Sequence, residues 1–440
     1  MSGSEDLRAR VMAALEERRG ALIELCRALG RQDSQNPPGD TTAIAAVCME
    51  ALAGAPGVMA QRVVRQAPKV NVVARVIGTA PDRLAPDGAD PDGVLPNGTA
   101  QRRRLVLNGH LDTAQLVAAE AWTFPPFGGC MEEGRIYGRG ITDMKAGIAA
   151  EIVAARVLGL FAAELHGELV LTLAADEGTG AENGTLHLLR EVPHASGNAM
   201  LSGDVGSPEV MRCGEKGFAW IEIVAHGKAA GGAHTYLGIN AIDLLVAALP
   251  DVTALDGHVG LLPPEVMRAI QAASERSEAI AGAGETAALR GITVNVGRIS
   301  GGNRPNAVPA EARALLDIRF PPGMTAWEIH GLVTAALESH PMVACQLLDH
   351  ADPTWTNPEH ELAGLVRKNA AEILGHPPAA TIRAGFSDAR FYRERGIPSI
   401  GYGVTAHNGG APDEYVEIED LWAVCAVHTL TALDYLSAPA

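Results

Sequence analysis

Apolar residues recur along the first part of the chain, first with the period of a helix and then in short runs typical of buried strands. Leu7, Val11 and Leu15 begin a series of apolar positions spaced near 3.6 residues, which predicts a helix over residues 5–30. Pro, Gly and Asp crowd residues 80–100, which predicts an exposed loop. We expect Val- and Leu-rich strands at 70–76 and 105–107, an Ala-rich helix at 145–160, a strand at 169–174 and another strand that ends at Met200. Such alternation predicts an α/β fold with a mostly parallel central sheet flanked by helices.

The middle of the chain has a different pattern. Its strands are expected at 218–225, 293–299 and 311–320, and its helices near 240–250 and 325–339. This mixture predicts an α+β domain inserted into the first one. After about residue 350 the α/β pattern returns, with a helix at 360–374, a strand at 398–402 and a helix at 418–436. We therefore expect one domain from residues 1–212 and 350–440, and an inserted domain over 213–349.

Composition and charge narrow the class of protein. Hydrophobic residues make up 47% of the chain and charged residues 20%, so a sizeable core can form. The formal charge of −17, with only Arg102–Arg104 as a basic cluster, argues against a nucleic-acid partner. The sequence contains no apolar run long enough for a membrane span, no apolar signal core at its start and no CxxC pair among six cysteines. We expect reduced thiols and a cytoplasmic location.

Residues capable of metal chemistry follow the predicted strands. His110 and Asp112 lie two apart at the end of an apolar strand, so both side chains share one face. Asp143 stands just before a helix, where an acid also serves as an N-cap. Each residue taken alone has such an ordinary explanation. The carboxyl ends of strands are nevertheless where α/β folds place their sites.

Three further strand ends add to this set. Asp176 and Glu177 lie in a Gly-rich loop after one strand, Asp204 follows another, and His407 follows the strand at 398–402. Nitrogen and carboxylate ligands without thiolates suit Zn²⁺ or Mn²⁺, with Co²⁺ also possible. An open position on such an ion would lower the pKa of a water molecule. These residues alone leave open whether Asp176 or Glu177 is the base.

The motifs together resemble the dinuclear metallo-aminoacylases and carboxypeptidases, a family that includes acetylornithine deacetylase, succinyl-diaminopimelate desuccinylase and bacterial glutamate carboxypeptidase. The resemblance extends from about residue 20 to residue 436. It is carried by GHLDT, GRGITDMKAG, ADEGTG, GEKGFAW, GKAAGGAHTYLGINAI, GGNRPNAVPAEARALLDIR, GFSDARFY and the C-terminal His. It implies a catalytic domain, and it implies that residues 213–349 form a lid that mediates homodimers or higher homo-oligomers.

The resemblance also implies a role for each site residue. His110 and Asp204 would bind the first metal and His407 the second, while Asp143 would bridge them and be followed by a cis peptide to Met144. Asp112 would orient His110 from outside the ligand set, and Glu177 would be the general base. The residues expected to contact substrate are Asn306, Arg319, Arg390 and His234. A guanidinium suits bidentate binding of a carboxylate, although an arginine on a strand or helix is more often an ordinary ion-pair partner.

Three departures from the family pattern bear on these roles. Gly178 stands where relatives place a second glutamate that binds metal, so we expect one tight ion and at most a weak second one. Gly231 stands where the lid usually has a histidine, and His234 follows three residues later. An enlarged Gly-rich loop, HNGGAPDE, separates His407 from the acidic pair after it.

The sequence therefore predicts a metal-dependent hydrolase that cleaves an amide-type C–N bond in a carboxylate-bearing small molecule. One alternative keeps the enzyme class and releases ammonia from an aromatic amine such as 5-nitroanthranilate. Another is a metal- or ligand-binding relative without catalysis, since Gly178 and Gly231 both replace expected groups.

Overall fold

The computed structural model describes residues 3–80 and 102–437, and the chain divides into two compact units. The first comprises Met1–Cys213, Thr356–Ala380 and Ser387–Ala440, and the second Gly214–Trp355 and Thr381–Phe386. The division falls close to the expected boundaries, with the short segment 381–386 added to the inserted unit. The loop expected at 80–100 lies almost wholly outside the described residues.

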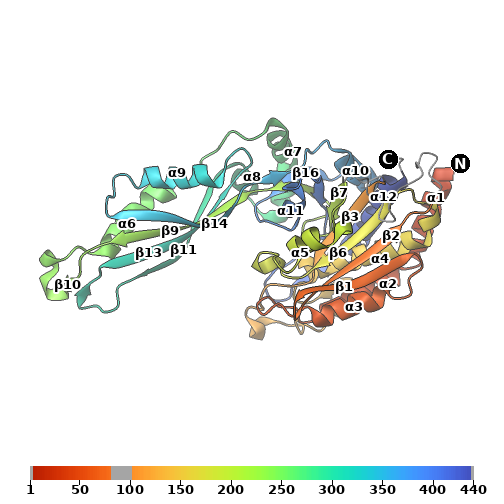
Figure 1. Cartoon of the computed structure of the whole chain (residues 1–440), viewed down its shortest axis with the longest axis horizontal. Helices are drawn as coiled ribbons and strands as arrows, with labels where there is room; N and C mark the ends of the chain where they lie inside the picture. Colours follow the sequence, from red (N-terminus) through yellow and green to blue (C-terminus); the bar gives the residue numbers. More distant parts are fainter. Residues whose placement is uncertain (1–2, 81–101, 438–440) are drawn as a thin grey trace. The chain divides into compact units, whose positions relative to one another are not determined.

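The first unit is built on a large sheet in which strands from distant parts of the chain are neighbours (Figure 1). Its order is β1-β2-β6-β3-β7-β17-β8. The four strands β6, β3, β7 and β17 run parallel, and β1 and β2 form an antiparallel edge. The strands are β1 (Val58–Gln66), β2 (Lys69–Ile77), β3 (Arg104–His110), β6 (Glu168–Ala174), β7 (Ala199–Ser202), β8 (Val210–Glu215) and β17 (Ser399–Gly401).

The parallel strands are the most apolar because helices cover both of their faces. Every residue of β3, β6 and β7 is buried. Helices α4 and α12 pack on one face, and α5 and α11 on the other. The helices of this unit are α1 (Gly3–Glu16), α2 (Arg19–Gly30), α3 (Thr42–Leu52), α4 (Ala146–Leu160), α5 (Thr185–Glu191), α10 (Glu361–Leu374), α11 (Ala389–Arg393) and α12 (Ile418–Ser437). The predicted α/β fold class is confirmed.

The first unit also contains a separate three-stranded antiparallel sheet. It consists of β18 (Tyr415–Glu417), β5 (Arg135–Tyr137) and β4 (Cys130–Glu132). Tyr415 is opposite Tyr137 in this sheet. It therefore joins the C-terminal region to the segment immediately before Asp143.

The second unit has a four-stranded antiparallel sheet in the order β11-β13-β9-β14. Buried and half-buried residues alternate along β13, as expected for a sheet covered on one face by α6 and α9. The elements are β9 (Gly217–His226), β10 (Ala230–Gly231), β11 (Thr293–Gly301), β12 (Ala307–Val308), β13 (Glu311–Phe320), β14 (Val343–Ala351), β15 (Thr354–Trp355), α6 (Ala241–Thr253), α7 (Pro264–Ala281), α8 (Glu285–Arg290) and α9 (Ala326–Ala336). Strand β16 (Ala379–Arg383) begins in the first unit and ends in the segment 381–386 of the second.

The helix predicted over 5–30 is interrupted. It forms two helices, α1 and α2, which end and begin on either side of Glu17 and Arg18. Gly20, a poor helix former, is the second residue of α2 and directly follows this charged break. Among the described residues, none of the helices combines the length and apolar character that crossing a membrane requires.

Candidate metal and catalytic site

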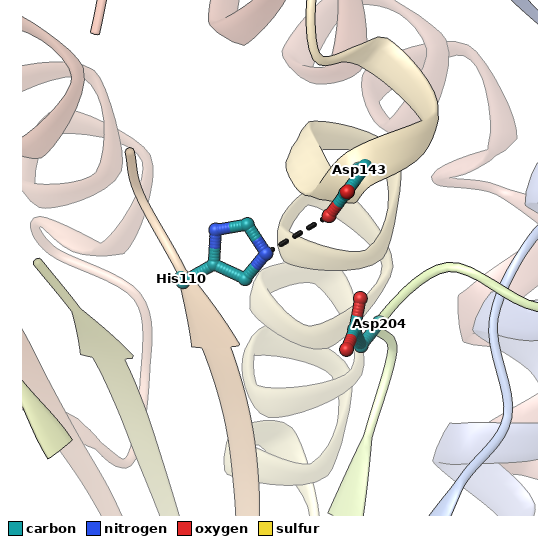
Figure 2. Close-up of side chains that lie close together, drawn as sticks. All are labelled: His110, Asp143 and Asp204. Carbon is teal, nitrogen blue, oxygen red and sulfur yellow. Dashed lines mark hydrogen bonds and ion pairs between the residues drawn. The ribbon is translucent and has the colours of Figure 1, made fainter. Parts of the chain in front are cut away.

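Three predicted metal ligands meet at the carboxyl edge of the main sheet (Figure 2). His110 is the last residue of β3, Asp204 follows β7, and Asp143 lies in the turn before α4. One ligand atom from each lies within 4.8 Å of the other two, and Nε2 of His110 is 3.0 Å from Oδ1 of Asp143. One imidazole and two carboxylates are a donor set that suits Zn²⁺ or Mn²⁺, so the residues present fit a divalent cation.

The His110 ring is held in the orientation that a ligand needs. Its Nδ1 donates to the backbone carbonyl of Asp112 over 2.8 Å. A carbonyl only accepts, so this bond places the proton on Nδ1 and leaves Nε2 facing Asp143. The Asp112 carboxylate, which the sequence led us to expect against His110, is 3.8 Å from that ring.

The Asp112 carboxylate instead holds the loop that carries the predicted base. Its two oxygens accept from the backbone N–H groups of Glu177 and Gly178, each over 3.0 Å. The Asn36 amide donates to the same carboxylate over 2.8 Å. Asp112 thus positions His110 through its main chain and Glu177 through its side chain.

Asp143 lies in a turn that a buried acid holds in place. Its peptide bond to Met144 is cis, as predicted. The residue that precedes α4 as N-cap is Lys145, so helix capping does not account for Asp143. Glu414 is fully buried and accepts from Nη1 of Arg139 (2.9 Å), the amides of Gly140 and Thr142 (3.1 and 3.0 Å) and the Thr142 hydroxyl (2.8 Å). These bonds fix Arg139, Gly140 and Thr142, which lie within four residues before Asp143.

The two acids of the Gly-rich loop have different surroundings. Asp176 accepts hydrogen bonds from Lys69, Thr179 and Asn183, and its backbone φ is +74°. Burial opposes its charge, but these bonds outweigh burial and lower the pKa of Asp176 to about 2. Asp176 therefore stabilises the loop, which favours Glu177 as the base.

The site has an excess of negative charge. Burial raises the pKa of Glu177 well above its ordinary value, and repulsion from Asp388, Asp204 and Asp143 adds to this effect against the opposing charge of His110. Burial acts to lower the pKa of His110, but its bond to Asp143 and the neighbouring carboxylates outweigh burial and raise it well above the usual range. Such a cluster is the environment in which a bound cation is most strongly favoured.

A pocket of about 360 Å³ opens beside the three ligands. Small residues form much of its wall. The lining residues are His110, Asp112, Thr113, Ala114, Arg139, Thr142, Asp143, Glu177, Gly178, Val205, Ala406, Gly409 and Gly410.

His407 does not join the three converging ligands. Its ring stacks on Tyr415 with 4.5 Å between centroids and an angle of 2° between the planes. The Tyr415 amide also donates to the His407 carbonyl over 3.2 Å. The enlarged loop between these residues brings Gly409 and Gly410, rather than the imidazole, to the pocket wall.

Two of the predicted substrate contacts lie together in the second unit. Gly231 is opposite Ala307 in the β10–β12 pair, and the Gly232 amide donates to the Asn306 carbonyl over 2.8 Å. His234 is exposed, and its Nδ1 lies 3.7 Å from the position that a Cβ on Gly231 would occupy. Its imidazole thus borders the space that a side chain at position 231 would enter.

The two predicted substrate arginines differ in their surroundings. Arg319 donates to Asp317 over 2.8 Å, and its guanidinium lies 5.3 Å from the ring centre of Phe218 and 5.6 Å from that of Phe386. Arg390 belongs to α11 in the first unit, and its guanidinium lies 4.6 Å from the Phe391 ring centre. Arg319 therefore already has an acidic partner.

Comparison with known proteins agrees with this geometry. Residues 106–434 match the model of peptidase family M20/M25/M40, and the chain belongs to that family. It is 27% identical over 333 residues to a protein named succinyl-diaminopimelate desuccinylase from Xanthomonas euvesicatoria pv. vesicatoria, covering 74% of this chain and 81% of that protein. A protein of the same name from Cereibacter sphaeroides is 28% identical over 348 residues, covering 76% and 84%. The chain is thus a metal-dependent hydrolase, and the predicted enzyme class is confirmed.

Solved structures share the fold at low sequence identity. An M20 family metallo-carboxypeptidase from Sulfolobus solfataricus has a TM-score of 0.70 at 19% identity, covering 95% of this chain and 98% of that one. Human carnosine dipeptidase 1 has a TM-score of 0.72 at 16% identity, covering 98% and 99%. A dinuclear metal-binding M20 peptidase from Bacillus subtilis has a TM-score of 0.59 at 14% identity, covering 96% and 99%.

The Glu414 contacts predict that Glu414→Gln both destabilises the protein and weakens metal binding. The substitution leaves the buried Arg139 without a charged partner, so we expect the free energy of unfolding to fall by about 3 kcal/mol. Urea unfolding of the metal-free protein measures this change. Glu417→Gln is the control, since the half-exposed Glu417–Arg135 pair should contribute no more than about 1 kcal/mol. Equal effects of the two substitutions would contradict the account.

Proposed function

We propose that the enzyme hydrolyses an amide bond in a small, carboxylate-bearing molecule. The observation that carries this proposal is that His110, Asp143 and Glu177 line one pocket and that Asp204 lies within ligand distance of the first two. A divalent cation bound there would supply Lewis acidity, which polarises a carbonyl and lowers the pKa of water. Convergence of the base with the ligands also argues against a binding protein that has lost catalysis.

Glu177 is the group of this chain that would move the proton. Its carboxylate would accept a proton from the attacking water and deliver it to the nitrogen of the leaving amine. The bonds from the Glu177 and Gly178 amides to Asp112 hold the main chain of this loop. Burial of Glu177 raises its pKa, which favours a base that can take up the proton and later release it.

The carboxylate on the substrate is proposed on two grounds. The named relatives act, by name, on a succinylated diamino acid, which carries carboxylates. Arg390 and Arg319 offer planar guanidinium groups that can bind such a group in a bidentate manner. Arg319 would have to exchange its bond to Asp317 for one to substrate.

A substrate panel read out for released amine, carboxylate and ammonia tests this function. We expect N-acyl and N-succinyl amino acids to release amine and carboxylate together, and Glu177→Gln to lower the rate at least 100-fold while keeping metal. Glu182→Gln is the control, because Glu182 lies exposed in the same loop and pairs with Arg65 and Arg190.

The outcomes of this panel separate the competing functions. Ammonia from an aromatic amine, without any amide hydrolysis, would favour the aminohydrolase alternative. Near-native rates in the Glu177→Gln protein would remove Glu177 from its role.

We also propose that the protein holds one tight ion per chain, of Zn²⁺ or Mn²⁺. Gly178 contributes no carboxylate, and His407 stacks on Tyr415 instead of joining the ligand group. A second ion near Asp143 would therefore lack two of the side chains that relatives supply. Weak occupancy of a second position at high metal concentration is compatible with this proposal.

Replacing Gly178 tests the metal count. A Cβ at this position would meet only Oδ2 of Asp112, at 3.4 Å, so a side chain can be accommodated. We expect one tightly bound ion in the native protein, and Gly178→Glu to tighten binding of a second ion at least tenfold, as measured by calorimetric titration of metal-free protein. Gly178→Gln controls for size without charge. Two tightly held ions in the native protein would rule the proposal out.

The spacing of the lid residues supports the proposal of a homodimer. Asn306 and His234 lie near the start of β13, and Arg319 near its end. A strand advances about 3.3 Å per residue, so these groups are roughly 25 Å apart within one chain. A small substrate that meets Arg319 of one copy can meet His234 or Asn306 only from another copy.

Mixing two inactive variants tests whether His234 acts across such a dimer. Glu177→Gln and His234→Ala should each be nearly inactive alone, the second because a lost hydrogen-bond donor to the reaction centre costs about 100-fold. Each mixed dimer would keep one of its two sites, with both Glu177 and a native His234 from the partner. An equal mixture, in which about half of the dimers are mixed, would therefore restore about a quarter of native activity. His226→Ala, at an exposed histidine of β9, is the control for the lid. No recovery in verified mixed dimers would contradict the arrangement.

A further inference from the structure

Glu151 is a buried acid beneath the metal ligands that the proposed chemistry does not use. It lies in α4, whose sequence AGIAAEIVAARVLGL is otherwise almost wholly apolar, and its exposure is 0%. Burying a carboxyl group among apolar side chains is unfavourable unless its oxygens are engaged. Packing of the helix alone therefore does not account for a carboxyl group at this position.

The Glu151 carboxyl group spans the ends of two strands. Oε1 accepts from the Gly203 amide over 2.8 Å. Oε2 lies 3.1 Å from the position that a Cβ on Gly109 would occupy, and it has no hydrogen-bond partner among the described residues. The carboxyl group thus occupies the space left by two residues without side chains.

These two glycines directly precede two of the ligands. The parallel register of β3 and β7 ends with Asn108 opposite Ser202, so Gly109 and Gly203 form the next pair beyond the ladder. His110 and Asp204 come immediately after them. The Gly203 amide has left the strand ladder at this point, and Glu151 supplies its acceptor.

Close packing around the same glycines leaves little freedom for another arrangement. A Cβ on Gly147, one turn before Glu151 in α4, would come within 2.2 Å of the Gly203 carbonyl oxygen. The His110 amide points to the sulfur of Met144, 3.1 Å away. The start of α4 therefore contacts both strand ends, and Glu151 is its polar contact with Gly203.

We propose that Glu151 is a positioning residue that sets the separation of His110 and Asp204 for metal binding. It does so by holding the Gly203 amide and filling the space beside Gly109. This inference rests on the proposed metal site but concerns affinity for the ion, not turnover. The polar partners that orient metal ligands in proteins typically change metal affinity 10–100-fold when removed.

Titration of metal-free variants with Zn²⁺ tests the proposal. Glu151→Gln keeps an acceptor of the same reach, and we expect its dissociation constant to stay within about threefold of native. Glu151→Met removes the acceptor at similar volume and should weaken binding at least tenfold. Glu151→Asp retains the carboxyl group but withdraws it by one methylene, and should show a similar loss.

Controls separate positioning from general stability. Val157→Ala, at a buried residue further along α4, should lower the thermal unfolding midpoint without weakening zinc binding. Glu151→Asp decides the question if Glu151→Met does not fold. Native affinity in Glu151→Met or Glu151→Asp, or a tenfold loss in Glu151→Gln, would overturn the proposal. If the native protein and His110→Ala bind zinc equally, the proposed metal site fails, whatever Glu151 does.

Discussion

Mutual repulsion among acids at the carboxyl edge of one parallel sheet is the constraint on which the structure of this site depends. Asp143, Asp204 and Glu177 lie around a single imidazole, and further carboxyl groups stand behind them. Burial raises the pKa of Asp388 to about 7 and that of Glu151 to about 8, and repulsion from Asp204 adds to both shifts. Separated charges of one sign in a poorly solvated region cost free energy, and a divalent cation between the ligands relieves that cost.

The fold resists this repulsion by fixing the ligands through hydrogen bonds to neighbouring residues. Asp112 holds His110 with its carbonyl group and the Glu177 loop with its carboxylate. Glu414 holds the turn before Asp143, and Glu151 holds the turn before Asp204. Glu414 and Glu151 thus act on main-chain amides just before a ligand, and Asp112 acts on the His110 ring and on the amide of Glu177. The ligand side chains are therefore presented to one point before any ion is bound.

The sequence predicted the parts of the site that local patterns encode. Apolar strands that end in His or Asp gave His110 and Asp204, because parallel strands bring their carboxyl ends to one edge. The family resemblance identified Asp143 as a metal ligand and Glu177 as the base. The hydrogen bonds that Asp176 accepts within its loop favour Glu177 over Asp176 as the base. The roles of Asn306, Arg319, Arg390 and His234 remain predictions.

Other features depend on tertiary contacts that no local pattern contains. Glu414 belongs to a polar, Gly-rich stretch of sequence that is typical of an exposed loop, and only the tertiary fold buries it against Arg139. The stacking of His407 on Tyr415 is a contact across the Gly-rich loop between them. Strand β1 was not predicted, because most of its residues are exposed or half-buried and lack a clear apolar alternation. Glu151 in an Ala-rich helix resembles a surface residue until the helix is seen against both strands.

The most direct measurement is anomalous diffraction at the zinc edge from crystals of the protein grown with Zn²⁺. The account predicts one strong peak per chain, about 2.0–2.2 Å from Nε2 of His110 and from carboxylate oxygens of Asp143 and Asp204. A peak that avoids these three side chains would contradict the account, as would two peaks of equal strength in each chain.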